Sequence, residues 1–361
     1  MSKLLKLDWI LMISVVLLLS IGLLALYSIS YEGSVFSGSY LAKQIISLII
    51  GLSAMLFLSF FDYRVFNSWS TRLYFIALIL LIAVIIFGVN VRGTTGWLGF
   101  LSLRMQPVEI SKLILIIFLA SFLSKKKTQL SILVRIISSI VLVFLPVSLI
   151  LKQPDFGSAS IIVGIWTVLL SYSGLNKKNF LILIAVLSLS AFSSWLFLEN
   201  YQKERIVNFV SPGRDPKGSG YNVIQSVVAV GSGKLVGKGL GHGSQSQLNF
   251  LPEKHTDFIF AVIAEELGFL GVAAIFILFG VIFWRIKEAA RLARDNFGYL
   301  LTIGIMAMIF FHLLINVGMN TGVMPVAGVP LPFLSYGGSF LVTTLLAIGL
   351  IQSIYIRRIK T

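Results

Sequence analysis

The chain has 361 residues, of which 57% are hydrophobic and only 12% are charged, and its mean hydropathy is +0.95. In soluble domains about a quarter of all residues are charged, so this composition predicts a membrane protein. The absence of cysteine excludes disulfides, thiolate catalysis and cysteine metal sites. The formal net charge of +15 lies in short segments between apolar runs, without the interleaved aromatic and basic residues that stack bases, so we expect no nucleic-acid partner.

Ten apolar runs divide the chain, and most approach the length of about 20 residues that a transmembrane helix requires. They lie at 8–28, 41–61, 71–90, 107–123, 136–151, 157–172, 180–198, 258–284, 298–319 and 339–356. The first run resembles a signal peptide, but no A-x-A-like cleavage site follows it, so we interpret it as a retained helix. We therefore expect an all-α polytopic membrane protein of about ten transmembrane helices, forming a single membrane domain over 1–361.

Lysine and arginine residues predict the orientation, because they are enriched in cytoplasmic segments. With a cytoplasmic N-terminus, 17 of them fall in inner segments, five in short outer segments or helix mouths, and seven in one long outer segment. Both termini are therefore predicted to be cytoplasmic. The long outer segment, 199–256, is rich in glycine and side-chain amides, and its length favours a functional role. Its stretch Tyr221–Val230 predicts a short amphipathic helix in the membrane interface.

Ionisable side chains inside or at the edge of a bilayer are costly and indicate function. In "FLPEKHTDFIFAVIAEELGFLG", residues 250–271, Asp257 opens the eighth apolar run. A helix N-cap and a general base are both consistent with this position, and the helix dipole would keep the carboxylate ionised. Glu265 and Glu266 lie about 12 Å deeper in the same helix. Because adjacent residues cannot share a helix face, at least one of the two acids needs a partner on another helix or at a helix end. We therefore expect a structural ion pair or hydrogen bond for these acids.

Two further segments carry charges near the outer surface. In "RMQPVEISKLILIIF", Glu109 and Lys112 are three residues apart and can pair on one helix face. That pair either neutralises itself or holds Lys112 toward an anionic ligand. In "LKQPDFGSASIIV", Asp155 lies in a tight turn indicated by Pro154 and Gly157. The last outer connection, "NTGVMPVAGVPLPFLSYGGSF", predicts irregular backbone that lines a pore or groove.

Motifs of soluble enzymes are missing from the sequence. "GSGKLVGKGLG" resembles a phosphate-binding loop but lacks the required pattern and its strand-to-helix context. His242, His255 and His312 lack metal-ligand spacing, so a zinc site is not expected. Two classes of function stay open. One is a transporter that moves its substrate through an outward-facing cavity, and the other is an enzyme that acts on a lipid-linked substrate.

Five motifs carry a family resemblance. "MQPVEISK", "QPDFGSA", "SPGRDPKGSGYNVIQS", "HGSQSQLNFLPEKHTDFIFAVIAEELGFLG" and "GVPLPFLSYGGSF" occur in the order found in the SEDS family of bacterial cell-wall polymerases. The resemblance spans nearly the whole chain. Within the family, "GRDP" and "HGSQSQLNFLPEKHTD" resemble the RodA branch more than the FtsW branch, which serves cell division.

The resemblance implies glycosyl transfer at the outer face of the bacterial cytoplasmic membrane. The implied substrate is lipid II, a disaccharide-pentapeptide on undecaprenyl pyrophosphate, which is polymerised during cell elongation. The resemblance implies functional roles for six residues of this chain. Asp257 corresponds to the family's essential aspartate, and Glu109 and Lys112 correspond to its conserved acid and lysine pair. Asp155 corresponds to its loop acid, Arg214 to a basic loop position and Trp97 to a tryptophan of the second outer loop. The implied partners are a class B penicillin-binding protein and the elongation proteins MreC and MreD.

The residue types fit this chemistry. A carboxylate at Asp257 would act as general base on a sugar hydroxyl, which typically accelerates a reaction about 10²–10⁴-fold. The leaving group departs as an anion, so cations such as Lys112, Arg214 and Lys254 would stabilise it. A divalent cation such as Mg²⁺ would suit the pyrophosphate, although no ligand cluster in the sequence demands one.

A lipid II flippase is the alternative function. A flippase needs a charged route through the bilayer, whereas the acidic and basic side chains of the candidate site cluster at the predicted outer end, and apart from Glu265 and Glu266 the middle of the predicted helices carries no charge. This distribution favours the polymerase, in which Glu265 and Glu266 would tie the eighth helix to its neighbours.

Overall fold

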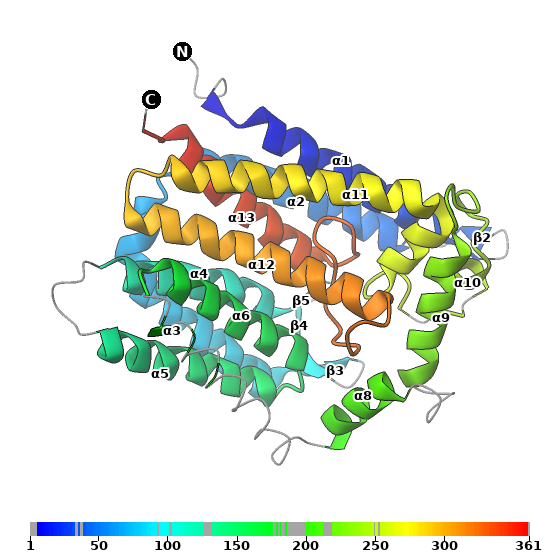
Figure 1. Cartoon of the computed structure of the whole chain (residues 1–361), viewed down its shortest axis with the longest axis horizontal. Coiled ribbons are helices and arrows are strands. Elements are labelled where there is room, and N and C mark those ends of the chain that lie inside the picture. Colours follow the sequence, from blue (N-terminus) through cyan, green and yellow to red (C-terminus); the bar gives the residue numbers. More distant parts are fainter. Residues whose placement is uncertain are drawn as a thin grey trace.

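The computed structural model describes residues 6–32, 35–36, 39–91, 94–100, 103–125, 132–175, 178–179, 181, 185, 200–211, 219–248, 250–251 and 253–359. These residues are mostly helical (Figure 1). The helices are α1 (Trp9–Ser28), α2 (Ser39–Phe60), α3 (Arg64–Phe87), α4 (Pro107–Ser124), α5 (Ile132–Leu151), α6 (Phe156–Tyr172), α8 (Asn200–Val210), α9 (Ser219–Ser232), α10 (Ser244–Gln247), α11 (Ile259–Arg291), α12 (Asn296–Asn320) and α13 (Gly338–Ile356).

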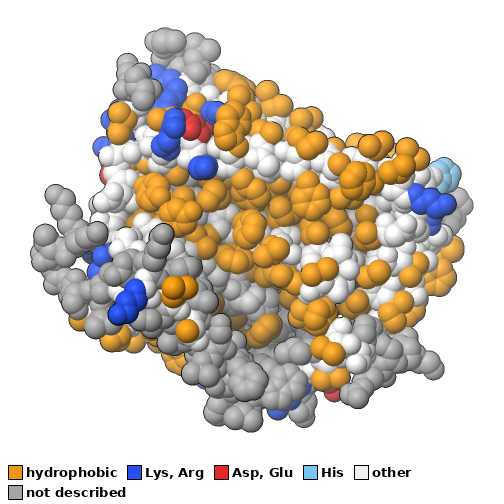
Figure 2. Space-filling model, in the orientation of Figure 1, with side chains coloured by type: hydrophobic (Ala, Val, Ile, Leu, Met, Phe, Trp, Pro, Cys, Tyr) orange, Lys and Arg blue, Asp and Glu red, His pale blue; other side chains and the backbone are white. Residues whose placement is uncertain are grey.

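Within the described ranges, eight helices are long and apolar enough to cross a membrane, namely α1–α5 and α11–α13, and α6 is apolar but has only 17 residues. Each coincides with a predicted run, whereas the run 180–198 lies outside the described residues apart from two isolated positions. The apolar side chains form a broad surface between more polar ends, and Lys and Arg gather mainly at the end that carries the termini (Figure 2). This surface is the one that lipid covers, so the chain is a multi-pass membrane protein.

The span most enclosed by protein is α4. Its apolar window is 83% buried, against 17% for that of α2, which therefore faces lipid. Helices α3, α6 and α12 pack around α4. Charged side chains on α4 must consequently find their partners inside the bundle.

The two termini lie at the same end of the molecule (Figure 1). Asp8 caps α1 by accepting a hydrogen bond from Leu11 N at 3.1 Å. The same carboxylate binds Arg285 Nε of α11 at 2.8 Å, and the Asp8 amide donates to Gln352 Oε1 of α13 at 2.9 Å. One capping residue thus joins three helices at this end, which agrees with the prediction that both termini share one side.

The predicted helical membrane bundle is confirmed, and short strands occur in two of the connections between its helices. Strands β1 (Tyr31–Glu32) and β2 (Val35–Phe36) pair between α1 and α2. Between α3 and α4, strands β3 (Val89–Val91), β4 (Thr94–Phe100) and β5 (Leu103–Met105) form an antiparallel sheet in the order β3-β4-β5. A search for long apolar runs does not detect these strands, because each has seven residues or fewer. Their backbone groups are satisfied by pairing with one another.

The long outer segment contains α8, α9 and α10, at the end of the molecule opposite the termini (Figure 1). Helix α9 confirms the amphipathic helix predicted for Tyr221–Val230. Its buried face includes Ser226 and Ala229, while Val227 and Val228 are exposed. The buried face packs on α11 and α12.

The connection between α12 and α13 folds back into the bundle. It has no helix or strand between residues 321 and 337, yet Leu331 and Leu334 are fully buried. Gly22 of α1 lies so close to this segment that an added Cβ would be 2.8 Å from Leu334 Cα. The prediction of irregular backbone that lines a groove is confirmed, because this segment forms one wall of the cavity described next.

Candidate functional site

A cavity of about 160 Å³, lined by both polar and apolar residues, brings together separated parts of the chain. Trp97 comes from β4, Asp155 from the turn before α6, Asp257 from the turn before α11, and Gly328 from the irregular segment after α12. Phe340 of α13 completes the wall. Three residues predicted from the sequence, Trp97, Asp155 and Asp257, therefore line the same space.

Asp257 lies beside the helix start without being the capping residue. Helix α11 begins at Ile259, and its N-cap is Phe258, whose side chain has no hydrogen-bonding group. Asp257 is thus one residue before the N-cap position. Its side chain lines the cavity, and an added Cβ on Gly328 would lie 3.7 Å from Asp257 Oδ2. Glycine at position 328 keeps the space beside the carboxylate open.

Asp155 has two roles. It is the N-cap of α6, where its Oδ1 accepts a hydrogen bond from Ser158 N at 2.9 Å. It also lines the cavity with Asp257. The expected turn is therefore present, and it directs a second carboxylic acid toward the site.

Glu109 and Lys112 form a buried pair behind the cavity wall. Lys112 Nζ lies 2.9 Å from Glu109 Oε2 and 2.9 Å from His312 Nε2 of α12. The His312 Nδ1 atom lies 3.1 Å from the carbonyl oxygen of Pro330, a residue that lines the cavity. If Nδ1 carries the proton and donates it to that carbonyl, Nε2 can accept from the lysine ammonium. Within the part of the chain that the structure describes, Lys112 supports the wall and is not part of the lining.

The other two predicted cations are placed differently. Lys254 is buried and donates from Nζ to the carbonyl oxygen of Ser246 at 3.0 Å, so it binds the α10 turn. Among the described residues it is not part of the cavity lining. Arg214 lies outside the described residues.

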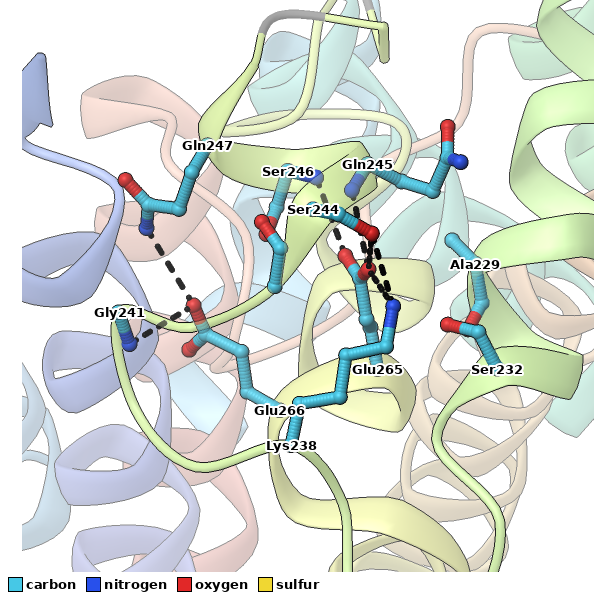
Figure 3. Close-up of polar contacts among 11 residues, drawn as sticks. Ala229, Ser232, Lys238, Gly241, Ser244, Gln245, Ser246, Gln247, Glu265 and Glu266 are labelled. Atoms are coloured by element: carbon cyan, nitrogen blue, oxygen red, sulfur yellow. Dashed lines mark hydrogen bonds and ion pairs between the residues drawn. The ribbon is translucent and has the colours of Figure 1, made fainter. Parts of the chain in front are cut away.

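The side chain of Glu265 holds the outer segment onto α11 (Figure 3). Its Oε1 pairs with Lys238 Nζ at 2.8 Å and accepts from Gln245 N at 3.0 Å, while its Oε2 accepts from Ser246 N at 3.0 Å. Its side chain is fully buried and that of Lys238 is 30% exposed. These contacts satisfy backbone donors at the start of α10.

Glu266 points the other way, toward α1. Its Oε1 accepts from Ser28 Oγ at 2.6 Å and from Gly241 N at 3.2 Å. The structural role predicted for both adjacent acids is therefore confirmed, since each binds a different element.

Helix α11 is interrupted two residues after this acidic pair. Gly268 has φ 65° and ψ −164°, which breaks the helical hydrogen bonding. The outer segment replaces the lost bonds, because Lys238 N donates to Glu265 O at 3.0 Å and Phe269 N donates to Lys234 O at 2.9 Å. The short outer part of α11, which follows Asp257, is consequently joined to the long outer segment.

Side chains of α2 contact the two segments that line the cavity. The amide of Tyr336, which lines the cavity, donates to His255 O at 2.8 Å. The His255 ring stacks on Tyr40 with a centroid separation of 4.5 Å. The Gln44 side chain accepts from Gly337 N at 3.2 Å. These contacts fix the two segments that carry Asp257 and the irregular wall relative to each other.

A family model described as "Cell cycle protein", which covers FtsW, RodA and SpoVE, matches residues 8–359. The chain belongs to this FtsW/RodA/SpoVE family. It is the family that the sequence motifs indicated.

Relatives from several branches of the family match over most of their length. The chain is 38% identical to stage V sporulation protein E of Bacillus subtilis over 96% of both chains. It is 40% identical to the peptidoglycan glycosyltransferase MrdB of Escherichia coli, over 88% of this chain and 85% of that protein. It is 35% identical to a probable FtsW of Trichlorobacter lovleyi over 98% of this chain and 94% of that one. These identities are too similar to assign the chain to one branch.

Solved structures of the family share the fold. One is a chain from a peptidoglycan synthase complex that coordinates polymerization and crosslinking, with a TM-score of 0.81 and 29% identity over 98% of this chain and 99% of that one. Another is the rod shape determining protein RodA of Thermus thermophilus, with a TM-score of 0.73 and 26% identity over 98% of both chains.

The sequence did not predict His312, Asn316 or Asn320 as site residues. All three are buried polar side chains on α12, within a run that reads as apolar. The signal that could have found them is their spacing of four residues, which places them on one helix face.

Proposed function

We propose that this chain is a peptidoglycan glycosyltransferase that polymerises lipid II at the outer face of the cytoplasmic membrane. The observation that carries the proposal is the side chain of Asp257 in a cavity beside the start of α11. That end of α11 lies opposite the termini (Figure 1). The relatives named peptidoglycan glycosyltransferases support the reaction class. A cavity at that end lets the sugars react in water while the prenyl tail stays in lipid.

The proposed reaction is one displacement at an anomeric carbon. A sugar 4-hydroxyl attacks that carbon and forms the new glycosidic bond, while the bond to the pyrophosphate oxygen breaks. The electron pair leaves with undecaprenyl pyrophosphate, and the hydroxyl proton passes to the Asp257 carboxylate. Because the leaving group departs as an anion, one general base suffices, whereas glycosidases use two carboxyl groups.

The other predicted residues support this reaction in different ways. Asp155 and Trp97 line the same cavity and would orient the sugars. Lys112 acts from behind the wall, where its charge is balanced by Glu109. We still propose that Arg214 and Lys254 provide positive charge that stabilises the pyrophosphate.

A divalent cation such as Mg²⁺ also fits the proposal. Mg²⁺ in proteins is commonly held by one or two carboxylates together with substrate phosphates. Asp155 and Asp257 are the carboxylic acids of the described cavity lining that would supply such ligands. Larger groups of three or more His, Cys, Asp or Glu side chains with metal-binding geometry do not occur among the described residues. When bound, the cation would neutralise charge on the pyrophosphate.

The finer assignments follow the motif resemblance. We propose a RodA-type role in cell elongation, with the FtsW-type division role as the alternative within the family. A class B penicillin-binding protein is the proposed partner, and the related chain from a complex that coordinates polymerization and crosslinking supports it. MreC and MreD are proposed on the motif resemblance alone.

A flippase is the competing function. It would need ionisable side chains along a route through the bundle. The buried charges found in the described part of α4, Glu109 and Lys112, are paired with each other instead. This pairing favours the polymerase.

The deciding experiment is the isosteric change Asp257→Asn in the full-length chain, purified with its transpeptidase partner and given lipid II. We expect the polymerisation rate to fall about 10²–10⁴-fold, since only the proton acceptor is removed. Asp62→Asn, at the end that carries the termini, is the matched control and should keep the wild-type rate. Polymer formation by Asp257→Asn at the wild-type rate would exclude Asp257 as the base. Lipid transfer across vesicles without any polymer from the wild-type protein would favour the flippase.

A further inference from the structure

Two buried amides on α12 hold the backbone of Asp257. Asn316 and Asn320 are both fully buried and lie one helical turn apart, on the same face. Asn316 Nδ2 donates to the carbonyl oxygen of Asp257 at 3.0 Å, and Asn320 Nδ2 donates to the same oxygen at 2.9 Å. Buried amides inside a membrane bundle are costly unless they are hydrogen-bonded. Here both amides donate a hydrogen bond to the backbone carbonyl of the proposed base.

Asn316 also binds the irregular segment beside Asp257. Its Nδ2 donates to the carbonyl oxygen of Val329 at 2.7 Å, in addition to that of Asp257. Val329 follows Gly328, the residue that leaves space beside Asp257 Oδ2. A primary amide has two N–H groups, so one side chain can bind both carbonyls at once. Asn316 therefore joins the segment that carries Asp257 to the segment that carries Gly328.

Asn320 fixes the turn from Asp257 into α11. While its Nδ2 binds Asp257 O, its Oδ1 accepts from Ala261 N at 3.2 Å. Ala261 lies in the first turn of α11, where backbone N–H groups have no partner within the helix. Because the N-cap residue is Phe258, this amide from α12 provides a cap that the local sequence lacks. Ser226 Oγ of α9 lies 2.9 Å from Asn320 O and 3.2 Å from Asn320 Oδ1, so its one hydroxyl proton can be donated to either oxygen.

We infer that Asn316 and Asn320 are positioning residues that place the Asp257 carboxylate against the sugar hydroxyl. The inference rests on the proposed function, because it assumes that Asp257 is the base. The two amides fix the backbone of Asp257, and Asn316 also fixes that of Val329 in the neighbouring segment. A small displacement of a reacting group is known to slow an enzymatic step about 10²-fold.

The test uses Asn320→Asp and Asn316→Asp in the full-length chain with its transpeptidase partner and lipid II. Each change keeps the side-chain shape and replaces the donor nitrogen with oxygen. We expect kcat to fall about 10- to 100-fold while KM changes less than about threefold, since the cavity persists but the base shifts. The introduced carboxyl can donate when protonated and not when ionised, so activity relative to wild type should decrease as pH rises.

The matched control is Thr302→Val, which removes a buried hydrogen bond to Gly298 O on the same helix, away from the cavity. It should keep kcat within about twofold, with a pH-independent ratio to wild type. If the carboxyl variants do not accumulate, Asn316→Ser, whose hydroxyl can bind one carbonyl, replaces them and should give an intermediate kcat. Wild-type kcat in the asparagine variants alongside an inactive Asp257→Asn would overturn the positioning role and leave the proposed function intact. An active Asp257→Asn would instead overturn the proposed function. Equal losses in Thr302→Val would also overturn the inference.

Discussion

Lys112 of α4 and His312 of α12 are 200 positions apart in sequence, yet their Nζ and Nε2 atoms lie 2.9 Å apart. The lysine also pairs with Glu109, and the histidine contacts the carbonyl of Pro330 in the cavity wall. The ammonium thus has two protein partners inside the bundle. This arrangement connects the most buried helix of the membrane domain to the irregular segment that faces Asp257.

The buried ion pair predicts the stability of variants at these positions. Lys112→Met should lower the free energy of unfolding by about 3 kcal/mol or more, because Glu109 is left as an uncompensated buried acid. The double variant Glu109→Gln with Lys112→Met should recover most of this loss. Thermal unfolding in detergent measures both. A single variant as stable as wild type would contradict the pairing.

The same variants separate a structural role of Lys112 from a direct one. If Lys112 only supports the wall, lipid II polymerisation should recover together with stability in the double variant. A stable but inactive double variant would show that the ammonium itself acts on the substrate, in a conformation where it reaches the cavity.

The Glu265 cluster predicts a local effect on the outer segment. Glu265→Gln should loosen residues 238–247, because the pair with Lys238 is lost and hydrogen bonds to a charged acceptor contribute about 1.5–3 kcal/mol. Faster hydrogen exchange in this segment is the measurement. Glu288→Gln is the matched control, because its partner Arg291 is largely exposed and such pairs contribute about 0–1 kcal/mol. Equal hydrogen exchange of residues 238–247 in the two variants would show that Glu265 does not hold this segment.

Two glycines of α11 should respond in opposite ways to alanine. Gly268 has positive φ, and an added Cβ would collide with the backbone nitrogen of Gly237, so Gly268→Ala should cost more than about 2 kcal/mol. Gly280 lies within the helix, and among the described atoms nothing is within 4 Å of its added Cβ. Gly280→Ala should therefore be neutral or up to about 1 kcal/mol stabilising. Thermal unfolding of both variants checks the break at Gly268, and equal melting temperatures would argue against it.

Tyr63, just before α3, predicts a pH effect at the end that carries the termini. Burial and the hydrogen bond that its hydroxyl donates to Asp295 Oδ2 at 2.7 Å raise the pKa of Tyr63 to about 12. Since an unperturbed tyrosine has a pKa of about 10, this contribution to stability is complete below pH 10 and disappears as pH rises through 12. Ultraviolet titration should show a late-ionising tyrosine that Tyr63→Phe removes. If Tyr63→Phe instead removes a tyrosine that titrates with an ordinary pKa, the hydrogen bond between Tyr63 and Asp295 is contradicted.

Helix positions could be predicted from the sequence because spanning a bilayer is a local property. Runs such as 107–123 and 298–319 become α4 and α12, since any segment of that length and polarity must satisfy its own backbone hydrogen bonds in lipid. The structural role of Glu265 and Glu266 was also predictable, because adjacent acids on one helix cannot share a partner. The strands between α3 and α4 were not, because they are short and stabilised by pairing.

The site itself was only partly readable. Asp257 and Asp155 were recognisable as costly carboxylates near the predicted outer surface, but nothing local distinguishes a capping aspartate from one that lines a cavity. That choice depends on Phe258 taking the N-cap and on Asn316 and Asn320 holding the turn from another helix.

The amino-acid sequence by itself determined that this chain is a membrane-embedded helical bundle with acids near one end, because hydrophobic length and charge are carried by each segment alone. Only the tertiary structure decided which of those acids share a cavity and which are bound by protein. Contacts such as Lys112 with His312, or Asp257 with Asn320, join residues far apart in the chain, and their geometry exists only after the helices have packed.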